Sequence, residues 1–394
     1  MEKRKIPAVR FKGFEDDWEQ RKLGEVTQKF KSGNSLKADK ISESGAYPVY
    51  GGNGLRGYTS TYNHEGEFAL IGRQGALCGN MNYFIGKAYF TEHAVAVEAD
   101  ENNNTRFMYY MLDTMNLGQY SDQSAQPGLA VNKLIKLENM FPKKEEQIKI
   151  ENYFQSIDHL ITLHQRKLEK LQLVKKSMLE KMFPKNGSKI PEIRFEGFAD
   201  DWEQRKLGEV LDDMYNGQTP SRNKSEYWNG NIKWLSSGEL NRGTVYDSIE
   251  MITEDGQKSA NLRIVPKGTF IMAITGLEAA GTRGNCALLG FDTTLNQSCM
   301  ALFPKKDLLT SDFLFQWYRK VGEEYGLNYT QGTKQQSYNA ELIKILPISL
   351  PLVTEQKKIA SYLSNIDHLI TLHQRKLEKM KSFKKSLLEK LFVQ

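Results

Sequence analysis

Two copies of the heptapeptide DDWEQRK carry side chains that could do chemistry. Each copy holds three acids and a lysine, and the candidate triad is Asp17, Glu19 and Lys22 in the first copy and Asp201, Glu203 and Lys206 in the second. Carboxylates and a lysine are groups with which a metal-dependent nuclease can bind Mg²⁺ and the phosphate that it cuts. Here they are crowded into one short stretch instead of being spread over a pair of strands. This crowding favours a surface turn over a nuclease site.

Two glycine-rich stretches match nucleotide-binding motifs in spacing alone. Residues 52–57 satisfy GxGxxG, but the YTSTYN that follows has β or loop character, where the dinucleotide motif needs a helix. Residues 276–281 have the spacing of a phosphate-binding loop, but Thr282 and Arg283 stand where Lys and Ser or Thr are required. We predict neither a dinucleotide site nor an ATP site.

The histidines form no recognisable catalytic or metal-binding group. His159 and His164 are five residues apart on one predicted helix, which places them on different faces. His64 and His93 have no neighbouring Ser or Cys in a nucleophile setting. The sequence contains no Pro-Pro pair, which the Asn/Asp-Pro-Pro-Tyr/Phe loop of adenine methyl transfer requires. We therefore predict no catalytic, cofactor-binding or metal-binding residues.

The composition indicates a cytoplasmic chain of several domains. Its 394 residues suffice for two or more domains. No apolar run approaches the length of a membrane span, and the charged N-terminus lacks a secretory signal, so no membrane partner is expected. Three cysteines without a CxxC pair argue for a reducing compartment and against a disulfide framework or a zinc site.

The net charge of +6 is distributed unevenly. Residues 143–185 and 355–394 together carry +9, and the rest of the chain carries −3. A protein that binds nucleic acid concentrates positive charge where it meets the phosphates. A solvated helix face explains the same lysines, so the charge leaves nucleic-acid binding open.

The chain contains an internal repeat of one unit. Residues 157–170, IDHLITLHQRKLEK, recur unchanged at residues 366–379. Residues 6–26 recur at residues 190–210 with four substitutions; we call these two stretches the leading segments. The period of roughly 200 residues is far too long for a solenoid, and it predicts an internal duplication with a pseudo-twofold relation.

The blocks between the leading segments and the helices diverge but keep parallel landmarks. FALIGRQGA near Phe68 corresponds to TFIMAITGL near Thr269, TEHAVAV at Thr91 to TLNQSCMAL at Thr294, and RFMYYMLDTM at Arg106 to DFLFQWYRKV at Asp312. Short strands broken by Gly, Asn and Pro, with one or two helices in each block, indicate α+β domains with polar loops. We expect a first variable domain at 1–142, a helix at 143–185, a second variable domain at 186–352 and a C-terminal helix at 353–394.

Each duplicated helix carries an apolar stripe with alternating four- and three-residue spacing, which is the pattern of a heptad seam. The predicted seam residues are Ile157, Ile161, His164, Leu168, Leu171 and Met178 in the first helix and Ile366, Ile370, His373, Leu377, Met380 and Leu387 in the second. Leu160 and Val174 are expected to widen the first stripe. Because a twofold relation explains why the copies are so alike, we predict an antiparallel coiled coil with one variable domain at each end.

His164 and His373 occupy seam positions near the midpoints of their predicted helices. A twofold axis near both midpoints would bring them together, where neutral imidazoles share a hydrogen bond and protonated ones repel each other. The alternative is that each histidine simply packs in the seam.

The whole pattern resembles the specificity subunit of type I restriction–modification enzymes. The resemblance is carried by both WEQRKLGEV copies, by YPVYGGNG, LIGRQGALCGN and YWNGNIKWLSSGEL, and by both helices. It implies a non-catalytic subunit of a methyltransferase and ATP-dependent endonuclease complex. Each variable block would be a target recognition domain that reads one half of a split, asymmetric sequence in double-stranded DNA. The helices would set the gap between the halves and help to dock two modification subunits.

The same resemblance implies cofactors on the partners and none on this chain. The modification subunits would bind S-adenosylmethionine and methylate adenine. Separate motor and nuclease subunits would use ATP and Mg²⁺ to cut DNA.

Candidate DNA-binding residues follow from the chemistry of base edges and phosphates. Arg, Lys, Asn and Gln suit base edges in the major groove, while Ser, Thr and Tyr position phosphates. The candidates are Asn53, Arg56, Tyr58, Arg73, Gln74, Asn80, Gln126 and Lys133 in the first block and Arg222, Asn223, Lys224, Ser237, Arg283, Lys334, Gln335 and Gln336 in the second.

An alternative from another class is a duplicated coiled-coil scaffold that binds protein or glycan ligands without DNA. It accounts for the repeats and for the nearly neutral variable blocks. It explains less well why these blocks diverged while the leading segments and helices stayed alike.

Overall fold

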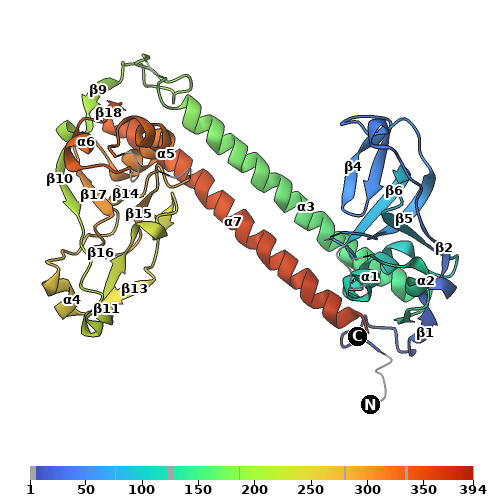
Figure 1. The fold of residues 1–394 in the computed structure, drawn as a ribbon. Helices are drawn as coiled ribbons and strands as arrows, with labels where there is room; N and C mark the ends of the chain where they lie inside the picture. The colour runs from blue at the N-terminus through green and yellow to red at the C-terminus, as the bar shows by residue number, and fades with distance from the viewer. Residues whose placement is uncertain are drawn as a thin grey trace. The chain divides into compact units, whose positions relative to one another are not determined.

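The computed structural model describes residues 6–75, 77–121, 128–185, 187–278, 281–332 and 336–393. The chain divides into two compact units. Unit 1 comprises Met1–Arg166 and Gln374–Gln394, and unit 2 comprises Lys167–His373. Each unit therefore contains one variable block together with parts of both long helices, which Figure 1 shows as α3 and α7.

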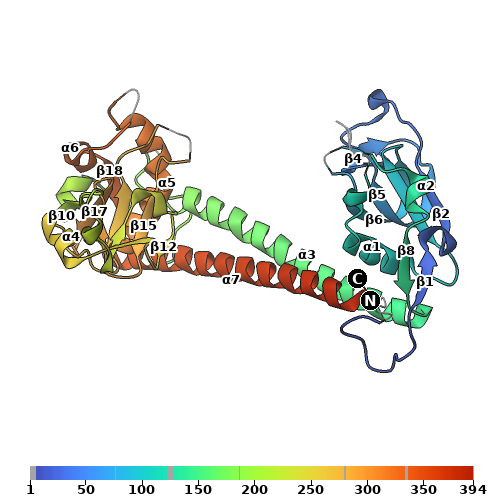
Figure 2. The same ribbon diagram turned by 60° about the horizontal axis from the view of Figure 1, so that its bottom comes forward.

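Unit 1 is built on a six-stranded mixed sheet with the order β2-β7-β5-β6-β3-β4, beside a two-stranded sheet of β1 and β8. Its elements before the first long helix are β1 (Glu19–Lys22), η1 (Leu23–Glu25), β2 (Thr27–Ser32), η2 (Ala38–Lys40), β3 (Tyr47–Gly51), β4 (Gly54–Thr59), β5 (His64–Gly72), β6 (Met81–Phe90), β7 (Ala94–Ala99), α1 (Thr105–Thr114), η3 (Leu117–Tyr120), α2 (Val131–Leu134) and β8 (Glu138–Phe141). Helix α1, predicted from RFMYYMLDTM, lies beside β5 and β6 (Figure 2).

The central strand β5 is apolar throughout its second half because both of its faces are covered. Successive side chains point to opposite faces of a sheet. Ala69 and Ile71 join the core beneath α1, whereas Phe68 and Leu70 join a second cluster with Phe90. This packing explains why FALIG reads as a continuous apolar run and not as an alternating one.

Unit 2 contains a five-stranded sheet with the order β10-β17-β14-β15-β12, a three-stranded sheet β13-β11-β16 and a two-stranded sheet β18-β9. Its elements between the long helices are β9 (Glu203–Lys206), η4 (Leu207–Val210), β10 (Leu211–Asn216), η5 (Ser225–Tyr227), β11 (Trp228–Leu235), η6 (Ser237–Glu239), β12 (Thr244–Val245), β13 (Glu250–Ile252), α4 (Glu254–Ser259), β14 (Phe270–Ala273), β15 (Cys286–Leu289), β16 (Thr294–Leu295), β17 (Cys299–Pro304), α5 (Ser311–Asn328), α6 (Ala340–Lys344) and β18 (Pro347–Leu350). Both units thus have the α+β character that the sequence predicts.

The two long helices are α3 (Lys144–Lys181) and α7 (Val353–Leu391). Every predicted seam residue is buried or half-buried. The prediction for Leu160 is wrong, because its side chain is 45% exposed. Leu160 lies about 100° around the helix from its neighbour Ile161, which takes it past the edge of the buried stripe.

Within each unit the helix segments run antiparallel. In unit 1 the first half of α3 packs on the end of α7, where Phe154 and Ile157 share a core with Leu391. In the same unit, Lys384 Nζ lies 2.6 Å from Asp158 Oδ1. The equivalent residues, exactly one repeat away, form the matching ion pair in unit 2, between Lys175 and Asp367. His164 and His373 belong to different units, so their meeting stays a prediction.

A charge reversal tests this helix register. Replacing Lys384 by Glu sets two like charges side by side, because Asp158 is its ion-pair partner in unit 1. We expect Lys384→Glu to lower the free energy of unfolding by about 1 kcal/mol and Asp158→Lys in the same chain to restore most of it. Urea unfolding of the two single variants and the double variant measures the coupling, and purely additive effects would contradict the pairing.

The leading segments contact the helices, which explains why these two parts of the repeat stayed alike together. The Arg10 guanidinium donates to both carboxylate oxygens of Glu146 at the start of α3, at 2.8 and 2.7 Å. Arg194 donates in the same way to Glu355 at the start of α7, at 2.8 Å twice. Both carboxylates are buried. A change in either partner would therefore leave a buried charge unpaired.

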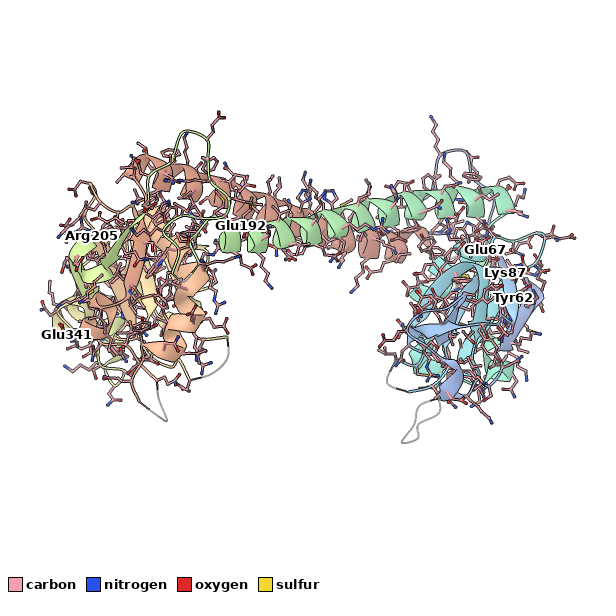
Figure 3. The ribbon with its side chains drawn as sticks, turned by 90° about the horizontal axis from the view of Figure 1, so that it is seen from above. Tyr62, Glu67, Lys87, Glu192, Arg205 and Glu341 are labelled. Carbon is pink, nitrogen blue, oxygen red and sulfur yellow. The ribbon has the colours of Figure 1, made fainter. Side chains whose placement is uncertain are left out.

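The leading segments also contact the end of the opposite helix. The Val9 N–H donates to Lys390 O at the end of α7 (3.0 Å), and the Ile193 N–H donates to Lys181 O at the end of α3 (2.9 Å). Glu192, which lies close to the end of α3 (Figure 3), accepts from Lys181 at 3.1 Å. Each leading segment thus joins the start of one long helix to the end of the other.

The stretches that resemble nuclease and nucleotide-binding motifs have other structural roles. Most of the first DDWEQRK copy forms β1, which pairs with β8, and its acids are exposed. Residues 52–57 form the turn and first residues of the β3–β4 hairpin, with no helix after them. In the part of the chain that the structure describes, no helix is long and apolar enough to cross a membrane.

Candidate nucleic-acid interface

One end of the main sheet in unit 1 carries a cluster of loops, which we call loop end 1. It consists of the β3–β4 turn (52–53), the β5–β6 loop (73–80, with residue 76 outside the description) and the β6–β7 turn (91–93). A Cβ on Gly72 would lie 2.3 Å from the Gly52 carbonyl oxygen, and a Cβ on Gly52 would lie 3.1 Å from the His93 carbonyl oxygen. Only glycine permits such close backbone contact. The glycines of YPVYGGNG and LIGRQGALCGN therefore bring the three loops together.

Unit 2 has a corresponding cluster, loop end 2. It consists of the β11–β13 connection (236–249), the described part of the β14–β15 loop (274–278 and 281–285) and the β16–β17 turn (296–298). The β11–β13 connection is longer than its counterpart because it contains η6 and β12. The two clusters therefore differ in outline as well as in side chains.

The same backbone hydrogen bonds support both loop ends. The Thr91 N–H donates to the Tyr50 carbonyl oxygen in unit 1, as the Asn296 N–H donates to that of Leu235 in unit 2 (2.9 Å each). Likewise, the bond from Arg73 to His93 matches the bond from Ile274 to Ser298 (2.9 Å each). The bond from Leu129 to Arg73 (2.9 Å) matches the bond from Tyr338 to Ile274 (2.8 Å). Tyr50 is thus equivalent to Leu235, and Thr91 to Asn296. The landmark match of Thr91 with Thr294 is wrong by two residues, because it followed a shared threonine and not the strand register.

Most first-block candidates are exposed. Asn53, Gln74 and Asn80 belong to loop end 1, and all three side chains are accessible. Arg56 and Tyr58 follow on the edge strand β4, the first exposed and the second half-buried. Of the three other candidates, Lys133 is exposed on α2, Gln126 lies outside the described residues, and Arg73 has a structural role.

Arg73 holds loop end 1 together. Its Nε donates to the Leu129 carbonyl oxygen at 3.2 Å, and a terminal nitrogen reaches the Glu92 carbonyl oxygen at 3.5 Å. The side chain is half-buried. It therefore joins the β5–β6 loop to the β6–β7 turn and to the segment before α2, and it acts as a positioning residue.

Arg222, Asn223 and Lys224 lie together beside the three-stranded sheet of unit 2. The Arg222 guanidinium donates to both carboxylate oxygens of Glu250 and stacks 3.7 Å from the centre of the Trp228 ring. The hydrogen bond from Arg222 lowers the pKa of Glu250, and the same bond raises the pKa of Arg222. Lys224 donates to the Tyr227 hydroxyl at 3.0 Å, and Asn223 is exposed between the two cations.

Arg283 and Gln336 meet at loop end 2. Arg283 donates to the Glu278 carbonyl oxygen at 2.7 Å and lies 3.5 Å from Gln336 Oε1. Ser237 is half-buried in η6 of the β11–β13 connection. The other two second-block candidates, Lys334 and Gln335, lie outside the described residues.

The structure adds a polar residue, Asn285, to the DNA-binding candidates that the sequence predicts. The Gly72 N–H donates to Asn80 O at 2.8 Å and the Ala273 N–H donates to Asn285 O at 2.9 Å, so Asn285 is the counterpart of the candidate Asn80. Each asparagine follows a glycine with a positive φ. The shared Gly-Asn pair at the end of both loops was the signal that could have revealed it.

The chemistry of both loop ends suits binding and not bond cleavage. Amide, hydroxyl and guanidinium groups dominate, and these are hydrogen-bonding groups for base edges and phosphates. Burial raises the pKa of the Cys78 thiol in loop end 1, which disfavours a nucleophilic thiolate. Among the described residues, no group of three or more His, Cys, Asp or Glu side chains could hold a metal ion.

Comparison with known protein families shows to which family the chain belongs. The family described as type I restriction modification DNA specificity domain matches residues 15–173 and again residues 199–382, which covers both repeats. The chain belongs to this family. Specificity subunits of type I restriction–modification systems are non-catalytic, and their role is recognition of the DNA sequence.

Individual members of the family are similar to this chain in sequence. The EcoprrI specificity subunit of Escherichia coli is 45% identical over 154 residues, an alignment that spans only 38% of each chain. A putative type I specificity subunit of Haemophilus influenzae is 25% identical over 91% of this chain and 89% of its own length.

A solved structure shares the fold of this family member. The type I restriction–modification S subunit from M. genitalium matches with a TM-score of 0.72 over 98% of this chain and 99% of its own, at 15% sequence identity. The arrangement of strands and long helices is thus kept where the sequence has changed almost completely.

Proposed function

We propose that this specificity subunit reads a split, asymmetric sequence in double-stranded DNA, one half with each loop end. The observation that carries the proposal is the shared set of backbone hydrogen bonds beneath unlike side chains. Two loop ends with the same backbone hydrogen bonds would approach the DNA in the same way, while their different side chains would select different bases. Asn53, Gln74 and Asn80 would serve the first half, and Ser237, Gln336 and Asn285 the second.

The long helices would set the gap between the two halves and help to dock two modification subunits. Antiparallel packing within each unit and the identical stretches at 157–170 and 366–379 support this part. Leu163 and its counterpart Leu372 are 46% and 39% exposed, so each repeat offers the same apolar side chain to a partner. S-adenosylmethionine would be bound by the modification subunits, and ATP and Mg²⁺ by the motor and nuclease subunits, all in the cytoplasm.

Methylation mapping tests the proposed function. Adenine methylation is sequenced in cells that contain the modification subunits, with and without this chain. We expect a two-part motif with unlike halves that appears only when the chain is present. An unchanged map in the presence of active modification subunits would reject the proposal and favour a scaffold that binds protein or glycan.

Single substitutions then assign each half to a loop end. Replacing Asn53 by Ala removes an exposed amide from loop end 1, so the first half of the motif should be relaxed and its affinity reduced by about 1–3 kcal/mol. The second half should be unaffected. Asn102→Ala is the matched control, because Asn102 is also an exposed asparagine but lies between β7 and α1. Equal loss from both variants would contradict the assignment.

A further inference from the structure

Leu55 and Ile249 are large aliphatic side chains that protrude into solvent beside loop end 1 and within loop end 2; Leu77, in loop end 1 itself, is 49% exposed. Leu55, at the start of β4, is 52% exposed, and Ile249, just before β13, is 85% exposed. Each lies among hydrogen-bonding residues: Leu55 follows Asn53 by two positions, and Ile249 lies in the same connection as Ser237. Fully burying such a side chain against an apolar surface contributes roughly 1.5–3 kcal/mol, so a partner that covers these exposed side chains gains part of this free energy.

The two residues occupy the same place in the two repeats. In unit 1, Leu55 pairs across the β3–β4 ladder with Tyr50. Tyr50 is equivalent to Leu235, because each accepts the corresponding N–H at the turn into the neighbouring strand. In unit 2, Trp234 pairs with Glu250 across the β11–β13 ladder. Leu235 and Ile249 come next beyond this last ladder pair, so by position in the chain Ile249 stands to Leu235 as Leu55 stands to Tyr50.

The backbone at both residues is held in place. The Ile249 N–H donates to Glu239 Oε2 at 2.8 Å, and the other oxygen of Glu239 accepts from the N–H and hydroxyl of Ser236 at 2.9 Å each. In unit 1 the ladder with Tyr50 holds Leu55, and the β3–β4 turn lies tightly against the β5–β6 loop through Gly52 and Gly72. A loop whose backbone is ordered before binding loses less entropy when a partner covers it.

We propose that Leu55 and Ile249 are specificity-determining residues, each of which contacts the 5-methyl group of a thymine in the major groove of its own half-site. The proposal rests on the proposed function and adds to it the base that each residue selects. The thymine methyl is the apolar group that a base pair presents in the major groove, and aliphatic side chains read it by contact. The two blocks differ in most of their residues, yet each has an exposed aliphatic residue at this position. Neighbouring amides and hydroxyls would read adjacent base edges.

Deoxyuridine tests the contact because it differs from thymidine by this methyl group alone. The full chain, assembled with its modification subunits, is bound to duplexes that carry the mapped motif, and thymines are replaced by deoxyuridine one at a time in each half. We expect one replacement in each half to weaken binding about fourfold, the factor that corresponds to one buried methyl group. Leu55→Ala should abolish this sensitivity in the first half only, and Ile249→Ala in the second half only.

Ile85→Ala and Ile264→Ala are the matched controls. Ile85 on β6 is 58% exposed and Ile264 before β14 is 45% exposed, and both lie outside the loop ends. These variants should discriminate thymine from uracil as the unmodified chain does. Sequence-specific binding without any uracil effect, or a uracil effect that persists in Leu55→Ala and Ile249→Ala, would overturn the thymine contact alone. Absence of sequence-specific binding in the unmodified chain would overturn the proposed function as well.

Discussion

Replacing Glu355 by Ala is expected to lower the free energy of unfolding of unit 2 by about 3–5 kcal/mol. The side chain of Glu355 is fully buried, and both of its oxygens accept from Arg194 at 2.8 Å. Removing the carboxylate leaves a guanidinium that is only 15% exposed without its counter-charge. Guanidinium-induced unfolding of the full chain measures the loss as a shift of the unit 2 transition.

The effect should belong to the buried pair and not to charge in general. Asp201→Ala removes an acid from the same leading segment, but Asp201 and its partner Lys189 are 63% and 65% exposed, so this variant should lose at most about 1 kcal/mol. Replacing both Arg194 and Glu355 by apolar residues should cost far less than Glu355→Ala. A loss below about 1 kcal/mol for Glu355→Ala would show that the pair is hydrated in solution.

Replacing Trp202 by Ala should cost a similar amount, about 3–5 kcal/mol, through the cavity that it leaves. Trp202 is 1% exposed and packs on Phe183 at the end of α3 and on Phe313 of α5, with ring centres 6.0 and 5.8 Å away. The indole thus joins the leading segment to both a long helix and the variable block. Thermal unfolding followed by near-ultraviolet circular dichroism measures the loss.

A second substitution at Trp202 separates the contribution of packing from that of hydrogen bonding. The indole Nε1 is buried without a hydrogen-bond partner among the described residues. Trp202→Phe therefore loses packing but no hydrogen bond, and it should cost clearly less than Trp202→Ala. In Trp228→Phe, by contrast, the bond from Nε1 to the Ser221 carbonyl oxygen is lost (3.1 Å), which adds about 1 kcal/mol to the packing change. Equal costs for Trp202→Phe and Trp202→Ala would contradict the packing account.

Local patterns in the sequence by themselves predict much of the organisation of this protein and its family. The duplication, the heptad stripes of both long helices, the helices at Arg106 and Asp312, and the resemblance to specificity subunits all follow from spacing and repetition along the chain. The physical reason is that helix periodicity and repeat identity are properties of neighbouring residues. The absence of an obvious catalytic motif likewise pointed to recognition, which the family assignment supports.

Only the tertiary structure decided which residues are partners over long separations. It showed that Arg10 and Arg194 each bind a buried glutamate at the start of a long helix. It also showed that Arg73 and Arg222 donate hydrogen bonds to other residues of the chain, and that Leu160 lies outside the seam. It also aligned Leu55 with Ile249, which no matching of letters could do because the connection before Ile249 contains an additional helix and strand. Strand register and side-chain burial depend on residues far apart in the chain, so a local pattern cannot specify them.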